Sequence, residues 1–400
     1  MKSLKILQII PHFKWEFGGP VRSVFELSSC LASIGNDVTV FCTSIGDGGR
    51  ITERDFPENL LEEHLGKVKV AYFDCDYNWP ADRLGIHLSN SLRHAIDTSI
   101  EEFDIVHLHE WRGTPNLYAW QSSRRHETRY ILQAHGSSPL VIGKQGPITI
   151  LSKILFDMSV GRRIVHDASG FVALTTAEAK QYMRAGAPME RIEVLPNGID
   201  SREFKILPKR GEFRRQYSIK DDEKVVLYLG RIHKNKGIDI LIDSFVQVTK
   251  SVQGCRLVIV GPDDGYLSAL RDMVDRLHAR NCIDFIGPLF GIDRIRAYVD
   301  SDVFVLPSLY EAFGRTIIEA TACGTYVIVS DRCGLAEFVQ RTAIGKVVSL
   351  DTGSFRDAII QALCDRSGRI GPNRAKEIVM AEFDWREITK KMEALYKKCQ

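Results

Sequence analysis

Short runs of hydrophobic residues alternate with helical patterns along the chain. In its first half these runs have the length and apolar content of buried strands, and they cover residues 4–10, 37–43, 68–73, 104–108, 130–134, 170–174 and 192–195. Residues 20–34 have an amphipathic helix pattern, with Pro20 in the first turn and Gly35 just beyond the end. Strand and helix repeated in this order predict a parallel sheet with helices on both faces.

The alternation pauses after the turn "LPNGID" (195–200) and then begins again. A polar stretch over 201–222 is followed by hydrophobic runs at 224–229, 256–260, 283–286, 303–306 and 326–329. Helical patterns accompany these runs at 237–250, 264–280, 291–300, 314–323 and 353–366, and a last amphipathic helix is expected at 384–399. We therefore predict an α/β protein of two doubly wound domains, residues 1–200 and 201–383, with ligands outside the carboxyl ends of the strands.

Composition narrows the class of protein. The chain has 400 residues, 44% of them hydrophobic and 26% charged, and a formal net charge of +2, which gives no reason to expect nucleic acid as a partner. Its nine cysteines include no C-x-x-C pair, so reduced thiols in a cytosolic protein are expected rather than disulfides or a zinc site. The apolar start of the chain is short and ends at Pro11, which favours a first strand over a signal peptide, and no apolar run is long enough to span a membrane.

One segment is strongly basic. Residues 111–166 contain eight Lys or Arg residues and two acidic residues, although residues 1–200 together have a net charge of −3. Two interpretations remain open: a solvated surface that is basic by chance, or a surface for an anionic lipid or an anionic acceptor.

The loop "YLGRIHKNKG" (228–237) is a candidate phosphate site. It places Arg231 and Lys236 between a strand and a helix, where a planar guanidinium and a movable ammonium suit a diphosphate. The helix beginning near Gly237 adds its positive end. An exposed basic loop is the alternative. Neither a Walker A motif nor a G-x-G-x-x-G after the first strand is present, which argues against a P-loop and against NAD.

Two glutamates flank a helix start in "YEAFGRTIIEA" (310–320). Glu311 is expected at the carboxyl end of the strand 303–306, and Glu319 about one and a half turns into the helix that Gly314 begins. The free N–H groups of that helix start can bind an anion. Each carboxylate could accept hydrogen bonds from hydroxyls on one side of that anion, a sugar or a ribose. Taken alone, Glu319 is more simply a surface acid.

These motifs together resemble a known family. The segments "LGRIHKNKGIDILIDSF", "SDVFVLPSLYEAFGRTIIEATACGTYVIVSDRCGLAEFV", "VLPNGID", "GGPVRSVFELSSCLASIGNDVTVF", "FDIVHLHE" and "QAHGSS" are similar to the retaining glycosyltransferases of family 4, also called glycosyl transferases group 1. The resemblance covers essentially the whole chain in order. It implies the GT-B fold, in which two Rossmann-like domains face each other across a cleft and a final helix, here 384–400, crosses back to the first domain.

The resemblance also implies roles for individual residues. Arg231 and Lys236 would hold the donor diphosphate, while Glu311 and His135 would lie beside the transferred sugar, and these four form the expected catalytic set. Other donor-site residues would contact the ribose, the base, the pyrophosphate or the sugar, in part through their backbones: Glu319, Leu289, Gly19, Phe313, Gly314 and Arg315. Of the two histidines in "HLHE", we expect His107 in the core and His109 at the rim, because at most one should face the cleft.

The implied reaction moves a hexose from a UDP- or GDP-sugar to a hydroxyl of a glycan or lipid-linked saccharide, with retention and without a metal or cofactor. Arg231, Lys236 and the helix start near Gly314 would neutralise the leaving diphosphate. No carboxylate is evident for a double displacement, so a front-face route is expected. The protein would be cytoplasmic, with the inner membrane face as an alternative location. Residues 139–167 match no family motif and leave the acceptor open. A sugar-nucleotide epimerase and a catalytically silent nucleotide-sugar-binding protein are the alternative functions.

Overall fold

The computed structural model describes residues 3–13, 19–44, 67–77, 86–137, 147–365 and 367–400. The chain divides into two compact units. Unit 1 comprises Met1–Gly198 and Trp385–Gln400, and unit 2 comprises Ile199–Asp384. The boundary after Gly198 lies within a few residues of the junction expected from the Pro-Asn-Gly turn.

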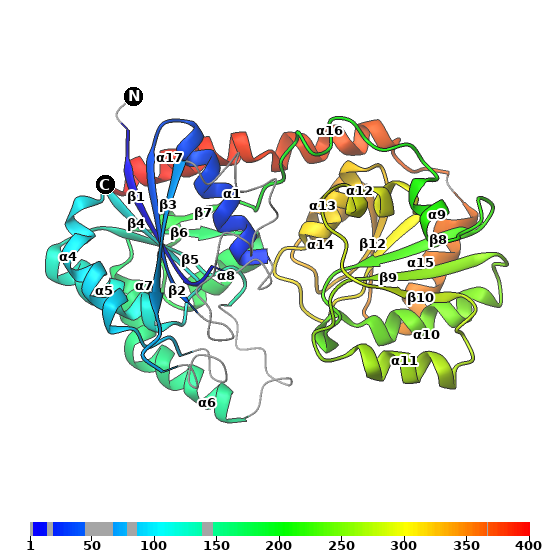
Figure 1. The fold of residues 1–400 in the computed structure, drawn as a ribbon, viewed down its shortest axis with the longest axis horizontal. Coiled ribbons are helices and arrows are strands. Elements are labelled where there is room, and N and C mark those ends of the chain that lie inside the picture. Colours follow the sequence, from blue (N-terminus) through cyan, green and yellow to red (C-terminus); the bar gives the residue numbers. More distant parts are fainter. Residues whose placement is uncertain (1–2, 14–18, 45–66, 78–85, 138–146, 366) are drawn as a thin grey trace. The chain divides into compact units, whose positions relative to one another are not determined.

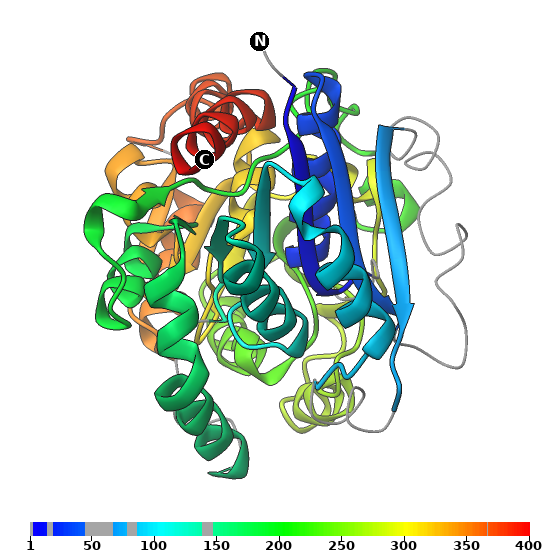
Figure 2. The ribbon, with the colours of Figure 1, turned by 90° about the vertical axis from the view of Figure 1, so that its left-hand side faces the viewer.

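Unit 1 contains a seven-stranded parallel sheet in the order β3-β2-β1-β4-β5-β6-β7. Figure 2 turns this unit toward the viewer, with β3 in light blue at one edge. The strands are β1 (Lys5–His12), β2 (Asp37–Ser44), β3 (Val68–Asp74), β4 (Ile105–His109), β5 (Tyr130–Gln133), β6 (Gly170–Ala173) and β7 (Ile192–Val194). The central strands are buried almost completely, because helices cover both faces of a parallel sheet.

The helices of unit 1 are α1 (Gly19–Ser33), α4 (Asn90–Ser99), α5 (Thr114–His126), α6 (Pro147–Phe156), α7 (Arg162–Asp167), α8 (Thr176–Arg184) and α17 (Trp385–Cys399). A π-helical segment, Asp157–Gly161, joins α6 to α7. The last helix, α17, lies alongside α1 (Figure 1) and is held there by a 2.6 Å hydrogen bond from Trp385 Nε1 to Glu26 Oε2. The C-terminal helix therefore completes the core of the first domain.

Unit 2 contains a six-stranded parallel sheet in the order β10-β9-β8-β11-β12-β13. Its strands are β8 (Lys224–Leu229), β9 (Cys255–Val260), β10 (Ile283–Ile286), β11 (Val303–Leu306), β12 (Tyr326–Ser330) and β13 (Gly345–Val348). Its helices are α9 (Glu212–Gln216), α10 (Ile238–Thr249), α11 (Leu267–Arg276), α12 (Gly291–Val299), α13 (Arg315–Ala322), α14 (Ala336–Thr342), α15 (Thr352–Cys364) and α16 (Pro372–Phe383). The predicted class, two doubly wound Rossmann-like sheets, is confirmed.

The strand order shows where each sheet can bind a ligand. In both sheets the order reverses next to the first strand, between β1 and β4 in unit 1 and between β8 and β11 in unit 2. Doubly wound sheets bind ligands at the carboxyl ends of the strands at this reversal, because the following loops run in opposite directions and leave a crevice. The loops after β8 and β11 contain Lys236 and Glu311.

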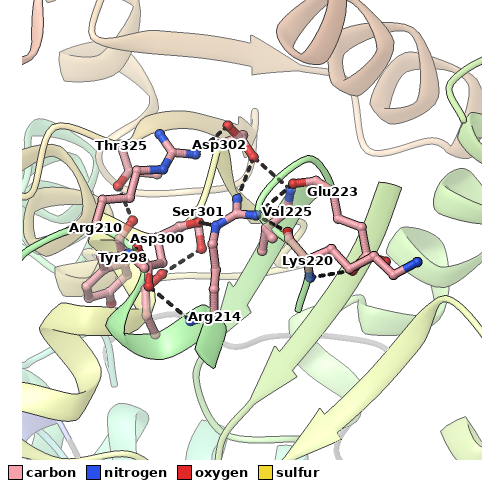
Figure 3. Close-up of polar contacts among 12 residues, drawn as sticks. Arg210, Arg214, Lys220, Glu223, Val225, Tyr298, Asp300, Ser301, Asp302 and Thr325 are labelled. Carbon is pink, nitrogen blue, oxygen red and sulfur yellow. Dashed lines mark hydrogen bonds and ion pairs between the residues drawn. The ribbon is translucent and has the colours of Figure 1, made fainter. Parts of the chain in front are cut away.

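A buried arginine lies at the amino ends of the strands of unit 2, opposite the carboxyl ends where ligands bind. The side chain of Arg214, on α9, is 2% exposed and contacts the Asp302 carboxylate at 3.2 Å. It also donates to the backbone carbonyls of Asp300, Lys220 and Glu223 at 2.8–3.1 Å. Figure 3 shows this network, with the more exposed Arg210 reaching the second oxygen of Asp302. Arg214 thus ties α9 to the starts of β8 and β11, far from their carboxyl ends.

Candidate active site

The loops after β8 and β11 are packed directly against each other. The N–H of Leu309 donates to the carbonyl of Asn235 at 2.9 Å. Gly237 ends the short 3₁₀ turn Lys234–Lys236 with φ +65°, and a Cβ at this position would lie 2.1 Å from the carbonyl oxygen of Pro307. Only glycine can satisfy both the positive φ and this close approach. The backbone contact brings the basic loop and the glutamate loop together.

Lys236 and Glu311 form an ion pair at the centre of this site. Lys236 Nζ lies 2.6 Å from Glu311 Oε2, and each side chain is 18% exposed. The backbone of Glu311 is itself held in place, since its carbonyl accepts a 2.8 Å hydrogen bond from the N–H of Gly334. The pair is therefore open to a ligand on one side and rigidly supported on the other.

Arg231 lies at the rim of the same loop. Its side chain is 53% exposed, and Nη1 contacts Asp264 Oδ2 at 2.8 Å. The buried hydroxyl of Tyr228 donates to the carbonyl of Arg231 at 2.9 Å, which fixes the loop backbone. Burial, with a smaller effect from the Glu311 carboxylate, raises the pKa of Tyr228 well above its usual range, so the phenol stays a donor. Thus Arg231 belongs to the same loop as Lys236 but pairs with a different acid.

The start of α13 lies beside Glu311. Gly314 precedes the helix with φ +95°, and a Cβ there would clash with the side chain of Ile317 at 2.6 Å. Phe313 is 3% exposed, and its ring packs edge-on against Phe383, with the ring centroids 5.8 Å apart. The Phe313 side chain is therefore part of the core, which leaves only its backbone to meet a ligand.

Glu319 is buried, so its interpretation as a simple surface acid is wrong. It is 2% exposed, its Oε1 accepts a 3.0 Å hydrogen bond from Arg315 Nε, and its Oε2 lies 3.6 Å from Arg294 Nε and 3.3 Å from the Tyr298 hydroxyl. Arg294, on α12, also pairs with Glu203. Glu319 is thus the centre of a buried charged cluster behind α13.

Two further residues predicted for the donor site are Leu289 in unit 2 and Gly19 in unit 1. Leu289 follows β10 and is half-buried. Gly19 is the first residue of α1, and a Cβ there would meet no atom of the described residues within 4 Å. The neighbouring Gly18 lies outside the described residues.

His135 follows β5 in unit 1 and forms a chain of hydrogen bonds with His109. His135 Nε2 lies 2.9 Å from His109 Nδ1, and His109 Nε2 lies 3.1 Å from Gln8 Oε1. Burial lowers the pKa of His135 to about 3, and burial with the neighbouring histidines lowers that of His109, so both rings are neutral at pH 7. With Gln8 Oε1 as acceptor, His109 carries its proton on Nε2, and His135 then donates from its own Nε2. His135 Nδ1 is left as a buried acceptor without a partner among the described residues.

The prediction for His109 is wrong. Both His107 and His109 are 0% exposed, and their ring centroids lie 4.0 Å apart. Residues two apart on a strand point to the same face, so the two rings lie together on one side of the sheet. His107 is in the core as expected, and its Nδ1 contacts the Tyr396 hydroxyl of α17 at 2.8 Å.

Glu110 was missed by the sequence reasoning, although it occupies the strand reversal of unit 1. It follows β4 directly and has φ +65°, and Asn116 Nδ2 donates to its backbone carbonyl at 2.8 Å. Its carboxyl group has no hydrogen bond or ion pair with any described residue, and burial raises its pKa to about 7. The only signal in the sequence is its place immediately after a buried strand.

Within the described ranges, no three His, Cys, Asp or Glu side chains are grouped so that they could hold a metal ion. The nine cysteines are all free thiols. In the same part of the chain, no helix combines the length and apolar character needed to cross a bilayer.

Two protein-family models match this chain. Residues 209–378 match the family model described as glycosyl transferases group 1, and residues 18–198 match the glycosyl transferase 4-like domain. The chain belongs to this family of glycosyltransferases. The model for residues 209–378 covers both the Lys236–Glu311 pair and the buried Glu319, so these features lie within the region that this chain shares with the family.

Relatives and solved structures extend over most of the chain. An uncharacterised glycosyltransferase of Methanocaldococcus jannaschii is 28% identical over 74% of this chain and 76% of its own length. A D-inositol 3-phosphate glycosyltransferase of Xylanimonas cellulosilytica is 25% identical over 95% of this chain and 91% of its own. The crystal structure of Anabaena Alr3699/HepE in complex with UDP and glucose has a TM-score of 0.78 at 20% identity, covering 99% of this chain and 100% of that one. This similarity shows the GT-B fold, as predicted.

Proposed function

We propose that this glycosyltransferase moves a hexose from a nucleotide diphosphate sugar, UDP- or GDP-linked, to a hydroxyl of a glycan or lipid-linked saccharide, with retention of the anomeric configuration. The observation that supports this best is the Lys236–Glu311 ion pair at the strand reversal of unit 2, beside the start of α13. The donor class is also supported by the solved structures of similar fold that hold UDP or UDP-glucose.

The pair suggests how the donor is received. The diphosphate is a stronger partner for Lys236 than a single carboxylate, because it presents several charged oxygens. It would displace Glu311, which repels it, and Glu311 would then accept hydrogen bonds from hydroxyls of the transferred sugar. Arg231 at the loop rim and the N–H groups at the start of α13 would share the charge of the leaving diphosphate. This arrangement supplies positive charge from the protein alone, and we propose that the transfer needs no metal ion or cofactor.

Glu319 is proposed to hold the ribose hydroxyls. An ionised carboxylate is an acceptor only, and each of its two oxygens can take more than one hydrogen bond. Its fixed position between Arg315 and Arg294 would make it a preorganised acceptor. Leu289, Gly19, Phe313 and Gly314 are proposed to meet the donor through their backbones.

In unit 1, His135 is proposed to contact the donor sugar through its unpartnered Nδ1, which can accept a hydrogen bond from a hydroxyl. Glu110 is proposed to bind the acceptor, because an unpaired carboxyl with a pKa near 7 can take a hydrogen bond or a proton from a hydroxyl. Glu110→Gln should then raise the KM for the acceptor and leave the KM for the donor unchanged. Equal effects on both KM values would place Glu110 outside the acceptor site.

Retention is proposed to follow a front-face route through an oxocarbenium-like state, in which the acceptor attacks from the side that the diphosphate leaves. The configuration of the product tests this directly. Proton NMR of the product from an α-linked donor should show an α-linkage, and a β-linkage would overturn the retaining mechanism.

A peripheral contact with an anionic membrane at the cytoplasmic face is also proposed. The side chains of Leu151, Leu155 and Met158 are 57%, 58% and 66% exposed and recur at the spacing of one helical face on α6 and the π-helical segment. Exposed apolar residues of this kind favour the headgroup boundary of a bilayer. Leu151→Gln/Leu155→Gln should weaken sedimentation with anionic vesicles, and unchanged sedimentation would contradict the contact.

The donor is identified by a thermal-shift screen against UDP-, GDP-, ADP- and TDP-sugars, since a ligand at a hundred times its Kd stabilises the folded state by about 2.7 kcal/mol. The stabilising donor is then offered with glycans, lipid-linked saccharides and an inositol phosphate, the last because several relatives are named for that acceptor. Transfer to any of them supports the proposal. Conversion of the donor alone to an isomer indicates the epimerase alternative, and binding without turnover indicates a silent nucleotide-sugar-binding protein.

A further inference from the structure

A second basic site lies in unit 1. A surface hollow of about 850 Å³ is bordered by the C-terminal ends of α5 and α8 and by α7. Its charged lining consists of four arginines, one histidine and one aspartate, namely Arg124, Arg162, Arg163, Arg184, His166 and Asp167. The volume is that of a pocket for a small molecule, and its walls are mainly guanidinium groups.

The positive charge of this hollow is largely uncompensated. The side chains of the exposed Arg162, Arg163 and Arg184 make no hydrogen bond or ion pair with any described residue. The one acid, Asp167, is already engaged, because its Oδ2 accepts a 2.9 Å hydrogen bond from Trp120 Nε1 and lies 3.7 Å from Arg124 Nε. Although burial alone raises it, hydrogen bonds from His166 and Trp120 and the charge of Arg124 bring the pKa of Asp167 below its usual range. Asp167 is therefore ionised at neutral pH, yet it offsets only one of the four arginines.

Helix α7 contributes two of these arginines to the hollow. Arg162 and Arg163 are consecutive residues of α7, which is anchored to the sheet by a hydrogen bond from the Tyr130 hydroxyl to the carbonyl of Ile164. The guanidinium of Arg124 lies 5.4 Å from the ring centroid of Trp120, which fixes its direction. Like charges gathered on rigid elements repel each other, and an anion that binds between them relieves this repulsion.

The hollow is separate from the site at the strand reversals. α5, α7 and α8 run toward the amino ends of β5, β6 and β7, where Tyr130, Gly170 and Ile192 begin the strands. Glu110 and His135 follow the carboxyl ends of β4 and β5, which are the opposite ends of the strands in the same sheet. A ligand in the hollow therefore does not occupy the position of donor or acceptor proposed for unit 1.

We infer that this hollow is a phosphate-binding site, which takes a multiply charged phosphate group such as a diphosphate or phosphate monoester. Guanidinium groups favour this chemistry, because their paired N–H donors match two phosphate oxygens at once. The phosphate can belong to a soluble metabolite or to a lipid headgroup, and the same arginines serve both. The inference does not depend on the function proposed for the Lys236–Glu311 site.

The test measures binding of inorganic pyrophosphate by calorimetry. All proteins in the test carry Lys236→Ala, which removes the lysine proposed to bind the diphosphate at the donor site. Arg162→Gln/Arg163→Gln/Arg184→Gln should weaken pyrophosphate binding by at least about tenfold, since each lost guanidinium removes charge-assisted hydrogen bonds. The matched control is Arg93→Gln/Arg129→Gln/Lys180→Gln, which loses the same charge from exposed positions outside the hollow. The control should bind within twofold of the background, and circular dichroism should show both variants folded.

A second arm distinguishes the source of the phosphate. Vesicles of phosphatidylcholine with and without phosphatidic acid are sedimented with the same variants. The hollow variant is the triple substitution Arg162→Gln/Arg163→Gln/Arg184→Gln. The site is assigned to a lipid headgroup if this variant alone loses sedimentation that depends on phosphatidic acid and no variant binds soluble pyrophosphate. Binding of pyrophosphate that depends on the hollow assigns it to a soluble phosphate. If the hollow variant and the control behave alike in both arms, the inference is overturned, whatever the outcome at the donor site.

Discussion

Lys236 and Glu311, which lie on loops after two different strands of unit 2, form an ion pair with 2.6 Å between Nζ and Oε2. The contact joins the two residues for which the sequence predicted different tasks, diphosphate binding and contact with the sugar. It implies that each is the other's partner until a donor arrives. Both tasks can then be tested through the pair.

Lys236→Ala should lower the rate of glycosyl transfer by roughly one to two orders of magnitude, because a hydrogen bond to a charged group is worth about 1.5–3 kcal/mol. Initial rates with the donor found in the thermal-shift screen provide the measurement. Arg210→Ala is the control and should leave the rate unchanged. This exposed arginine contacts Asp302 at the amino end of β11, away from the Lys236–Glu311 pair. A rate for Lys236→Ala within twofold of wild type would show that the loop does not bind the leaving group.

Glu311→Gln should raise the affinity for the free nucleotide diphosphate, by up to about fivefold. It removes the carboxylate that competes for Lys236, and a partly exposed ion pair is worth up to about 1 kcal/mol. The same variant should slow transfer, because the charge beside the sugar is lost. Calorimetry with the nucleotide and a transfer assay on the same preparation are sufficient. Weaker binding of the nucleotide by Glu311→Gln would rule out competition between carboxylate and diphosphate.

Glu319→Ala should destabilise the protein by about 3 kcal/mol, since it removes the carboxylate that the buried Arg294 and the half-buried Arg315 share. Glu311→Ala, at a more exposed position, should cost less than about 1 kcal/mol. Urea unfolding of the two variants gives the comparison. Equal costs for both would contradict the buried cluster behind α13. Glu319→Gln, which keeps the shape, should remain folded and bind the nucleotide more weakly if Glu319 holds the ribose.

Unit 1 should lose stability in acid through its buried histidines. Burial lowers the pKa of His135 to about 3 and those of His12 and His87 to about 4, below the ordinary value of 6.5. Below pH 6.5 these histidines are therefore protonated in the unfolded chain but stay neutral in the folded chain. The free energy of unfolding of unit 1 falls as the pH drops from 6.5 toward 4. Each such histidine contributes a slope of about 1.4 kcal/mol per pH unit.

Calorimetric melting between pH 7 and pH 4 tests this dependence. His135→Gln should show a shallower decline in Tm than wild type, whereas His94→Gln, at an exposed histidine, should follow the wild-type curve. Parallel curves for all three proteins would show that His135 is not held neutral by burial.

Arg214 and Arg210 contact the two oxygens of the same carboxylate, Asp302, but only Arg214 is buried. Arg214→Ala should therefore cost about 3–5 kcal/mol, because it removes the buried charge partner of Asp302 and a donor to three backbone carbonyls. Arg210→Ala should cost less than about 1 kcal/mol. Unfolding free energies that differ by less than 1 kcal/mol between the two variants would contradict this division.

The strands and their order of appearance were predictable, because buried parallel strands are short, nearly continuous apolar runs. The exception is β13, whose four residues "GKVV" contain two apolar side chains and lie at the sheet edge. The location of Glu311 was also predictable, since it follows a strand and precedes a glycine-capped helix.

Contacts between distant segments could not be predicted. The burial of Glu319 depends on Arg294 of α12, which only the tertiary fold brings to α13. The shared face of His107 and His109 follows from the two-residue period of a strand, and the expectation of a rim position for His109 ignored that period. Glu110 directly follows the two histidines of "HLHE". Its positive φ and its unpaired carboxyl are features of the structure that the sequence does not reveal.

The position of the donor diphosphate is tested most directly by one calorimetric experiment, the titration of wild type and Lys236→Ala with the nucleotide diphosphate of the preferred donor and with the nucleoside alone. Wild type should bind the diphosphate with an affinity that falls by roughly tenfold or more in Lys236→Ala, as expected for a lost charge-assisted hydrogen bond. The weaker affinity for the nucleoside should be the same in both proteins. Equal loss for nucleoside and diphosphate, or no loss for either, would contradict the assignment of the leaving diphosphate to the Lys236–Glu311 site.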